Sequence, residues 1–254
     1  PPFLQDLGSR RPPLARPAAP SSCSLREAMA QAAQLMAKVL QELMGPGADF
    51  EVGPITLKHG LTYPKGFLRV PATMAAFYQE NFKRFADNEF IIFESERYTY
   101  RQVDEHCAAL AWSLASQFGI QPGDRVGISM RNYPEWCFAF IAITRIGAVA
   151  VPFNSLWKEE EYAFGLKDSG TKVLICDPER HRLAAGSCAS LGVHTIVTRA
   201  PKGQPPAGAV AYAAVVEAGK GKAAPDALNV DSDDMAALLY TSGTTGNPKG
   251  VMLS

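Results

Sequence analysis

From about residue 101 to residue 197, the sequence alternates between segments with helical periodicity and short apolar runs. The helical segments repeat apolar residues three and four positions apart, whereas the runs are rich in valine, isoleucine and alanine. Parallel strands need a long crossover between them and are buried on both faces, so they read as continuous apolar runs. The alternation therefore predicts an α/β fold, in which a mainly parallel sheet with right-handed crossovers is flanked by helices.

The expected elements continue this alternation towards both ends of the chain. The apolar run Met235–Tyr240 predicts a buried strand, and a further short strand or helix is expected near residues 210–217. Helices are expected over residues 73–85, 101–118, 134–146, 158–167 and 178–191, strands over 125–130, 148–151, 172–176 and 193–197, and a hairpin from 90–93 and 97–100.

The amino-terminal region has a different composition. Residues 1–23 are rich in proline and arginine and lack a hydrophobic period, which predicts a disordered leader; an organellar transit peptide is the alternative. Ser24 and Glu27 form an S-x-x-E capping box, which predicts an amphipathic helix over residues 24–45. Its apolar positions lie three and four residues apart, so we expect it to pack on its own domain or to pair with another helix.

The composition argues against several classes of protein. Lysine plus arginine equals aspartate plus glutamate at 25 each, so neither a nucleic-acid surface nor a polybasic membrane patch is indicated. The five cysteines contain no C-x-x-C pair and the four histidines no H-E-x-x-H pair, so we predict no protein-bound metal. The apolar run 136–153 contains Arg145, which costs about 3 kcal/mol at a bilayer centre. We therefore expect a helix followed by a strand there, and no transmembrane segment.

The most informative segment is residues 241–251, Thr-Ser-Gly-Thr-Thr-Gly-Asn-Pro-Lys-Gly-Val. Glycines let successive backbone N–H groups turn toward one concavity, hydroxyl groups donate to phosphate oxygens, and a lysine adds a positive charge. These residues suit a polyphosphate, although they fit neither a Walker A loop nor a dinucleotide fingerprint. A flexible linker is the ordinary alternative, but a linker does not follow a buried strand directly. The predicted site residues are Thr241, Ser242, Gly243, Thr244, Thr245, Gly246 and Lys249.

This stretch resembles the signature loop of the adenylate-forming (AMP-binding) superfamily, which comprises acyl- and aryl-CoA ligases, luciferases and the adenylation domains of peptide synthetases. The resemblance covers about residues 48–254, where the overall sequence pattern is most similar to that of fatty-acyl-CoA ligases. It implies an incomplete N-terminal domain of such an enzyme. Upstream blocks that are similar to the same domain are residues 98–103, 123–126, 131–136, 145–154 and 166–170.

The resemblance implies two half-reactions. A carboxylate attacks the α-phosphorus of ATP, which carries Mg²⁺, to give an acyl-adenylate and pyrophosphate, and coenzyme A then displaces AMP. It also implies that the loop from Thr241 to Lys249 holds the β- and γ-phosphates, with Lys249 countering their charge. The family's catalytic lysine follows this loop, beyond Ser254, so the chain by itself is expected to be inactive. The upstream blocks are expected to be scaffold, with Glu135 on a helix face and Trp136 against the core.

The sequence leaves the acid, the thiol acceptor and the oligomeric state open. A fatty acid is the leading hypothesis, and an aryl-acid ligase or a carrier-protein-loading adenylation domain is the alternative, because the residues that choose the acid lie downstream. A hypothesis from another class is a non-catalytic form that binds nucleotide or a partner helix. We expect partners that are small molecules (a carboxylic acid, ATP and coenzyme A), no nucleic acid, and a cytoplasmic location, with organellar import as the alternative.

Overall fold

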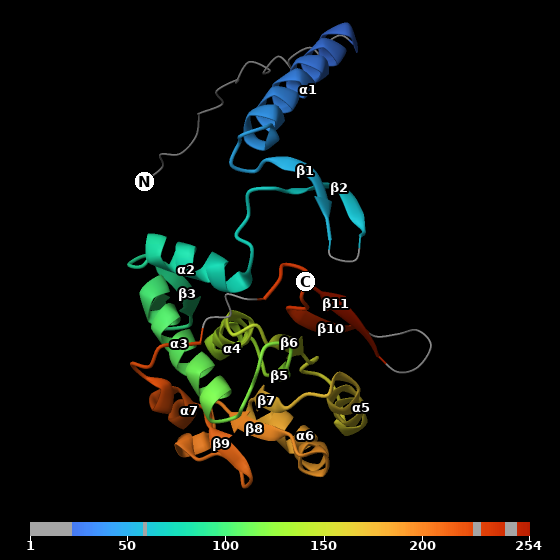
Figure 1. Cartoon of the computed structure of the whole chain (residues 1–254). Coiled ribbons are helices and arrows are strands. Elements are labelled where there is room, and N and C mark those ends of the chain that lie inside the picture. Colours follow the sequence, from blue (N-terminus) through green and yellow to red (C-terminus); the bar gives the residue numbers. More distant parts are fainter. Residues whose placement is uncertain (1–21, 58–59, 226–229, 242–247) are drawn as a thin grey trace, which may run out of the picture. The chain divides into compact units, whose positions relative to one another are not determined.

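The computed structural model describes residues 22–57, 60–225, 230–241 and 248–254 (Figure 1). The chain divides into two compact units, Pro1–Arg69 and Val70–Ser254. Nearly all of the leader predicted over residues 1–23 lies outside the described residues.

The first unit contains a long helix and a hairpin. Helix α1 (Ser22–Met44) begins two residues before the predicted cap at Ser24, a difference within the range by which helix ends vary with the criterion. Strands β1 (Val52–Thr56) and β2 (Thr62–Phe67) pair antiparallel. The apolar side chains of α1 from Met29 to Leu43 are exposed, and the buried core of the described residues lies entirely in the second unit.

The second unit is built on a seven-stranded sheet in the order β11-β10-β6-β5-β7-β8-β9. Neighbouring strands run parallel except β10 and β11, which are antiparallel. The predicted α/β architecture with a mainly parallel sheet is therefore confirmed. The strands are β5 (Arg125–Ser129), β6 (Val149–Pro152), β7 (Val173–Cys176), β8 (His194–Val197), β9 (Ala209–Ala211), β10 (Ala237–Thr241) and β11 (Lys249–Leu253).

Helices cover both faces of this sheet (Figure 1), and the alternation of side chains along a strand decides which helices each residue meets. On β7, Val173 and Ile175 join the apolar cluster of α2, α3, α4 and α7, whereas Leu174 and Cys176 join that of α5 and α6. Because both faces are buried, every position of β7 is apolar. The helices are α2 (Met74–Arg84), α3 (Tyr100–Ser116), α4 (Pro134–Arg145), α5 (Glu159–Ser169), α6 (Pro178–Leu191) and α7 (Tyr212–Gly219), with the hairpin β3 (Glu89–Phe93) and β4 (Glu96–Thr99) and a 3₁₀ turn over Pro201–Gly203.

The long apolar run around Arg145 is a buried helix followed by a buried strand, as the sequence predicted. Arg145 ends α4 with its side chain only 9% exposed, and its guanidinium donates to the Asp104 carboxylate at 2.5 Å. The charge is therefore balanced by a partner on α3. In the described ranges, no helix has the length and apolarity that a membrane crossing requires.

The last two strands differ from the sequence prediction. The run expected to form a buried strand is β10, but among the residues of that strand only Ala237 is buried, and Leu239 is 37% exposed. The prediction of a buried strand was therefore wrong for most of its length. The register that joins β10 to β6 consists of the single pair Ala237–Ala150, so the rest of β10 has no described backbone ladder with β6. β11 was not predicted, and all of its residues are exposed.

Candidate functional site

Two of the predicted loop residues, Thr241 and Lys249, are described by the structure and lie side by side. Thr241 ends β10, Lys249 begins β11, and the two are direct partners in the antiparallel ladder. The Thr241 hydroxyl donates to the Lys249 carbonyl oxygen at 3.4 Å. The two ends of the predicted phosphate loop are thus held together. The other predicted site residues, Ser242, Gly243, Thr244, Thr245 and Gly246, lie outside the described residues.

These loop ends lie at the edge of the sheet where the parallel strands have their carboxyl ends. β10 is parallel to β6, which is parallel to β5, so Thr241 points to the same edge as Pro152 and Ser129, the last residues of those strands. Ligands of open α/β sheets bind outside the carboxyl ends of the strands. The location of Thr241 and Lys249 therefore agrees with a ligand site.

Lys249 presents its charge to solvent. Its side chain is exposed, and none of the ion pairs between described residues involves it. The next residue, Gly250, packs closely on β10, because a Cβ there would lie 2.9 Å from Cδ1 of Leu238. A glycine at this position lets β11 approach β10 and so fixes where the lysine backbone lies. No described carboxylate competes with an anion for the Lys249 charge.

Tyr240, immediately before Thr241, is held by aromatic side chains and by one carboxylate. Its ring centroid lies 6.1 Å from that of Phe153, 5.6 Å from that of Trp157 and 6.4 Å from that of Phe164. Its hydroxyl donates to Oδ2 of Asp168 at 2.5 Å. Burial of the ring and the hydrogen bond to Asp168 raise the pKa of Tyr240, so the hydroxyl stays protonated at neutral pH. From the sequence, Asp168 was expected only as part of a scaffold block and Tyr240 only as the end of a strand.

After β6 the chain passes to the other side of β5, where β7 lies. The polar groups that follow β5 and β7 bond to one another. Asp177 follows β7 and caps α6 by accepting from the backbone N–H of Arg180 at 3.0 Å. The same carboxylate accepts from the backbone N–H of Arg131 at 3.1 Å and from the Arg180 guanidinium at 3.3 Å. The acceptor capacity of Asp177 is used internally, so these residues serve the scaffold.

A second charged cluster lies at the carboxyl end of β8. Arg199 donates to Glu135 at 3.0 Å and to Glu96 at 2.9 Å, and its guanidinium lies over the rings of Phe93 and Tyr133. Glu135, which was expected on a helix face, lies in the first turn of α4 and is an ion-pair partner of Arg199. Because the Arg199 guanidinium is engaged by two carboxylates and two aromatic rings, we assign the cluster a structural role. Trp136, as predicted, packs against the core, where it stacks on Phe140.

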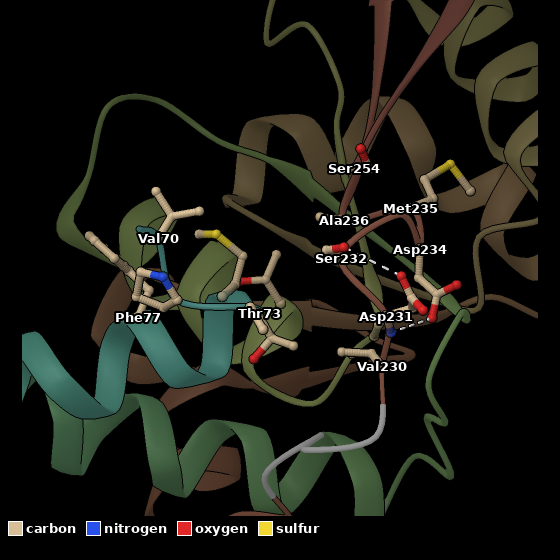
Figure 2. A pocket seen from close by; sticks show the side chains of 16 residues that line it. Val70, Thr73, Phe77, Val230, Asp231, Ser232, Asp234, Met235, Ala236 and Ser254 are labelled. Atoms are coloured by element: carbon tan, nitrogen blue, oxygen red, sulfur yellow. Dashed lines mark hydrogen bonds between the residues drawn. The ribbon is translucent and has the colours of Figure 1, made fainter. Parts of the chain in front are cut away.

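A cavity of about 400 Å³ lies at the opposite edge of the sheet (Figure 2). Ala148 and Ala236, which precede β6 and β10, line it together with Val70 and Phe77. Thr241 lies at the other end of β10 from this cavity. Asp231, Ser232 and Asp234, which also line the cavity, belong to a turn in which the Asp234 carboxylate accepts from the backbone N–H of Asp231 at 2.8 Å (Figure 2). The cavity is therefore remote from the candidate phosphate site.

Taken together, the fold and the loop ends describe an α/β domain with a candidate anion site at the carboxyl edge of its sheet. The family model described as "AMP-binding enzyme" matches residues 78–254, and the chain belongs to this family of adenylate-forming enzymes. The resemblance to the adenylate-forming superfamily is thereby confirmed; the match begins at residue 78, whereas the resemblance was expected to begin at about residue 48.

Relatives and solved structures agree with this membership. The chain is 31% identical to "Probable CoA ligase CCL9" of Humulus lupulus over 72% of its length and 34% of that protein's. It is 34% identical to "Long-chain-fatty-acid--CoA ligase FadD13" of Mycobacterium tuberculosis over 61% of its length and 29% of that protein's. A crystal structure of the anthranilate CoA ligase AuaEII with anthranoyl-AMP superposes with a TM-score of 0.64 at 26% identity, over 72% of this chain and 35% of that one. The chain thus spans about a third of the length of these proteins.

Proposed function

We propose that the protein containing this chain is an acid–thiol ligase that activates a carboxylic acid with ATP and transfers the acyl group to coenzyme A. In the first step a carboxylate oxygen bonds to the α-phosphorus of ATP while the bond from that phosphorus to pyrophosphate breaks. In the second, the thiol sulfur bonds to the acyl carbon, AMP leaves with the electron pair of the broken C–O bond, and the thiol proton is lost to solvent. Family membership and the likeness to CoA ligases support this proposal.

The observation that carries the proposal is the pairing of Thr241 with Lys249 at the carboxyl edge of the sheet. We assign the phosphate site to Thr241, Ser242, Gly243, Thr244, Thr245, Gly246 and Lys249. In this assignment Lys249 faces the β- and γ-phosphates, and a charge-assisted hydrogen bond of this kind contributes about 1.5–3 kcal/mol. The hydroxyl groups and backbone N–H groups share the remaining phosphate oxygens.

Mg²⁺ enters this scheme with ATP. Among the described residues, no three histidine, cysteine, aspartate or glutamate side chains gather in a way that could hold a metal ion. We therefore assign no metal ligand to these residues and treat Mg-ATP as the substrate. The protein groups named above position the nucleotide and balance its charge.

For the acid, we propose a medium- or long-chain fatty acid. The overall sequence pattern of the domain and the likeness to a long-chain-fatty-acid ligase support this proposal. An aryl acid is the second candidate, because a ligase of anthranilate has the similar fold. Loading of a carrier protein and a non-catalytic, nucleotide-binding form are the remaining alternatives.

The proposal is tested with the full-length protein. Acid-dependent exchange of labelled pyrophosphate into ATP reports the first half-reaction, and thioester formation with coenzyme A reports the second. We expect both, with kcat/KM highest for a fatty acid. A preference for aryl or amino acids would reject the substrate assignment, and the absence of exchange with every acid class would reject the reaction.

A further inference from the structure

The two ends of β10 are attached to the domain in different ways. At its amino end, Ala237 pairs with Ala150 of β6, and the Ala150 N–H donates to the Ala236 carbonyl at 3.0 Å. No further residue of β10 takes part in the described register with β6. The carboxyl end, which carries Thr241, is therefore held on this side by side chains and not by a backbone ladder.

The side chain that holds it is Tyr240, which enters a box of three aromatic rings. Phe153, just after β6, stacks on Tyr240 at an interplanar angle of 26°, and Trp157 meets it edge-on at 65°. Phe164, on α5, completes the box at 80°. Offset-stacked and edge-to-face arrangements are the favourable ones for aromatic pairs. The ring of Tyr240 is thus seated in a defined orientation.

Gly165 makes room for this box. A Cβ at that position would lie 2.5 Å from Cζ3 of Trp157 and 3.0 Å from Cε1 of Phe153. Any larger residue would displace the two rings on which Tyr240 rests. The box is therefore built by the packing of α5 against the segment that follows β6.

The hydroxyl of Tyr240 adds one directional contact to this packing. It donates to Asp168 of α5 at 2.5 Å, the short distance typical of a hydroxyl bonded to an ionised carboxylate. Asp168 lies 72 residues earlier in the chain and on another element, so the bond joins the end of β10 to α5. Rotation or sliding of the strand end would break it.

From these contacts we infer that Tyr240 and Asp168 are positioning residues, which hold the end of β10 so that Thr241 and its ladder partner Lys249 stay in register at the phosphate site. This inference rests on the proposed function. Neither side chain contacts the reacting atoms in this scheme, since both act through Thr241 and through the Thr241–Lys249 pair. The effect is therefore expected in the use of ATP and not in the later transfer to the thiol.

The test uses the full-length protein and a matched control. Tyr240→Phe keeps the ring and removes the hydroxyl, Asp168→Ala removes the acceptor, and Asp168→Asn retains an oxygen that can accept. Tyr98→Phe is the control, because the Tyr98 hydroxyl makes an equally short bond of 2.5 Å to Glu96, with both residues on β4 of the β3–β4 hairpin. The measurements are KM for ATP, kcat of the first half-reaction, and the rate of thioester formation from preformed acyl-adenylate.

We expect Tyr240→Phe and Asp168→Ala each to raise KM for ATP by about three- to tenfold, the effect of one net hydrogen bond. The double variant should be no worse than either single variant, since both remove the same bond. Asp168→Asn should recover most of the affinity, and thioester formation from preformed adenylate should be unchanged. Tyr98→Phe should leave KM for ATP as in the wild type. Equal KM in all variants, or an equal rise in the control, would overturn the inference.

Amide hydrogen exchange separates this inference from the proposed function. If Tyr240 holds the strand end, Tyr240→Phe should speed exchange in β10 and β11 next to the loop by about three- to tenfold, whereas Tyr98→Phe should not. Wild-type exchange rates in Tyr240→Phe would overturn the inference even if the enzyme activates acids. Absence of adenylation in the wild-type protein would reject the proposed function and leave the exchange result to decide the inference.

Discussion

Lys249→Ala is the substitution that tests the candidate phosphate site most directly. The side chain is exposed and makes no ion pair with a described residue, so its removal should change folding stability by less than about 0.5 kcal/mol. The phosphate contact that it is proposed to make contributes about 1.5–3 kcal/mol. Since each 1.36 kcal/mol is a factor of ten, adenylation should slow by about ten- to a hundredfold. Activity should remain, because the loop hydroxyls and backbone N–H groups are still present.

The assay compares the two half-reactions of the full-length protein. Pyrophosphate exchange should fall, whereas thioester formation from preformed acyl-adenylate involves no β- or γ-phosphate and should keep its wild-type rate. Lys220→Ala is the control, since Lys220 is also exposed, at 74%, and lies at the end of α7. Wild-type exchange by Lys249→Ala, or an equal loss in both half-reactions, would refute this role for the lysine.

Three further outcomes are expected. Residues 1–254 produced alone should show no acid-dependent pyrophosphate exchange, because they correspond to about a third of the length of related ligases; exchange above a heat-killed control would contradict this. Gly219→Ala should destabilise the domain by about 3 kcal/mol in urea unfolding, since its Cβ would lie 2.0 Å from the Ala109 carbonyl oxygen; Gly186→Ala, with nothing within 4 Å, should not. Burial lowers the pKa of His106 to about 4 in the folded protein. As the pH falls below 6.5, His106 therefore binds a proton in the unfolded chain before it does so in the folded protein. The free energy of unfolding should drop by up to about 3 kcal/mol between pH 6.5 and pH 4, a drop that His106→Gln should reduce.

The parallel strands could be predicted from sequence because burial on both faces leaves a continuous apolar run, as in Val173–Cys176. The helices and strands predicted for the second unit have ends within about two residues of those observed. The order of the strands in the sheet could not be predicted from the sequence, because it depends on whether each crossover places the next strand on one side or the other of the strands already formed. β11 was missed since Lys249–Leu253 is short and contains a glycine, and its three apolar residues form neither the alternation nor the longer apolar run that predicts a strand.

For the candidate site, the types of residue could be predicted from the sequence, whereas the residues that they contact could not. Hydroxyls, glycines and a lysine in one short stretch indicated an anion site without any knowledge of the fold. The pairing of Thr241 with Lys249 follows from a hairpin whose second strand was not recognised. The bond between Tyr240 and Asp168 joins residues that are 72 positions apart, and only the packing of α5 beside β10 brings them together. Sequence reasoning therefore found the groups proposed to bind phosphate and missed those that hold them.

β11 is the first strand in the order of the sheet, so within the described residues it is an edge strand with no strand paired to its outer side. Its last three side chains are apolar and exposed, with Val251 44%, Met252 73% and Leu253 43% exposed. An open edge of this kind presents a row of backbone donors and acceptors that can pair with any extended chain. Material made from these residues alone should therefore associate edge to edge as its concentration rises, and a lysine at position 252 should suppress that association. In a longer chain the same edge is a template on which another strand can be added while β5, β6, β7 and β8 stay as they are.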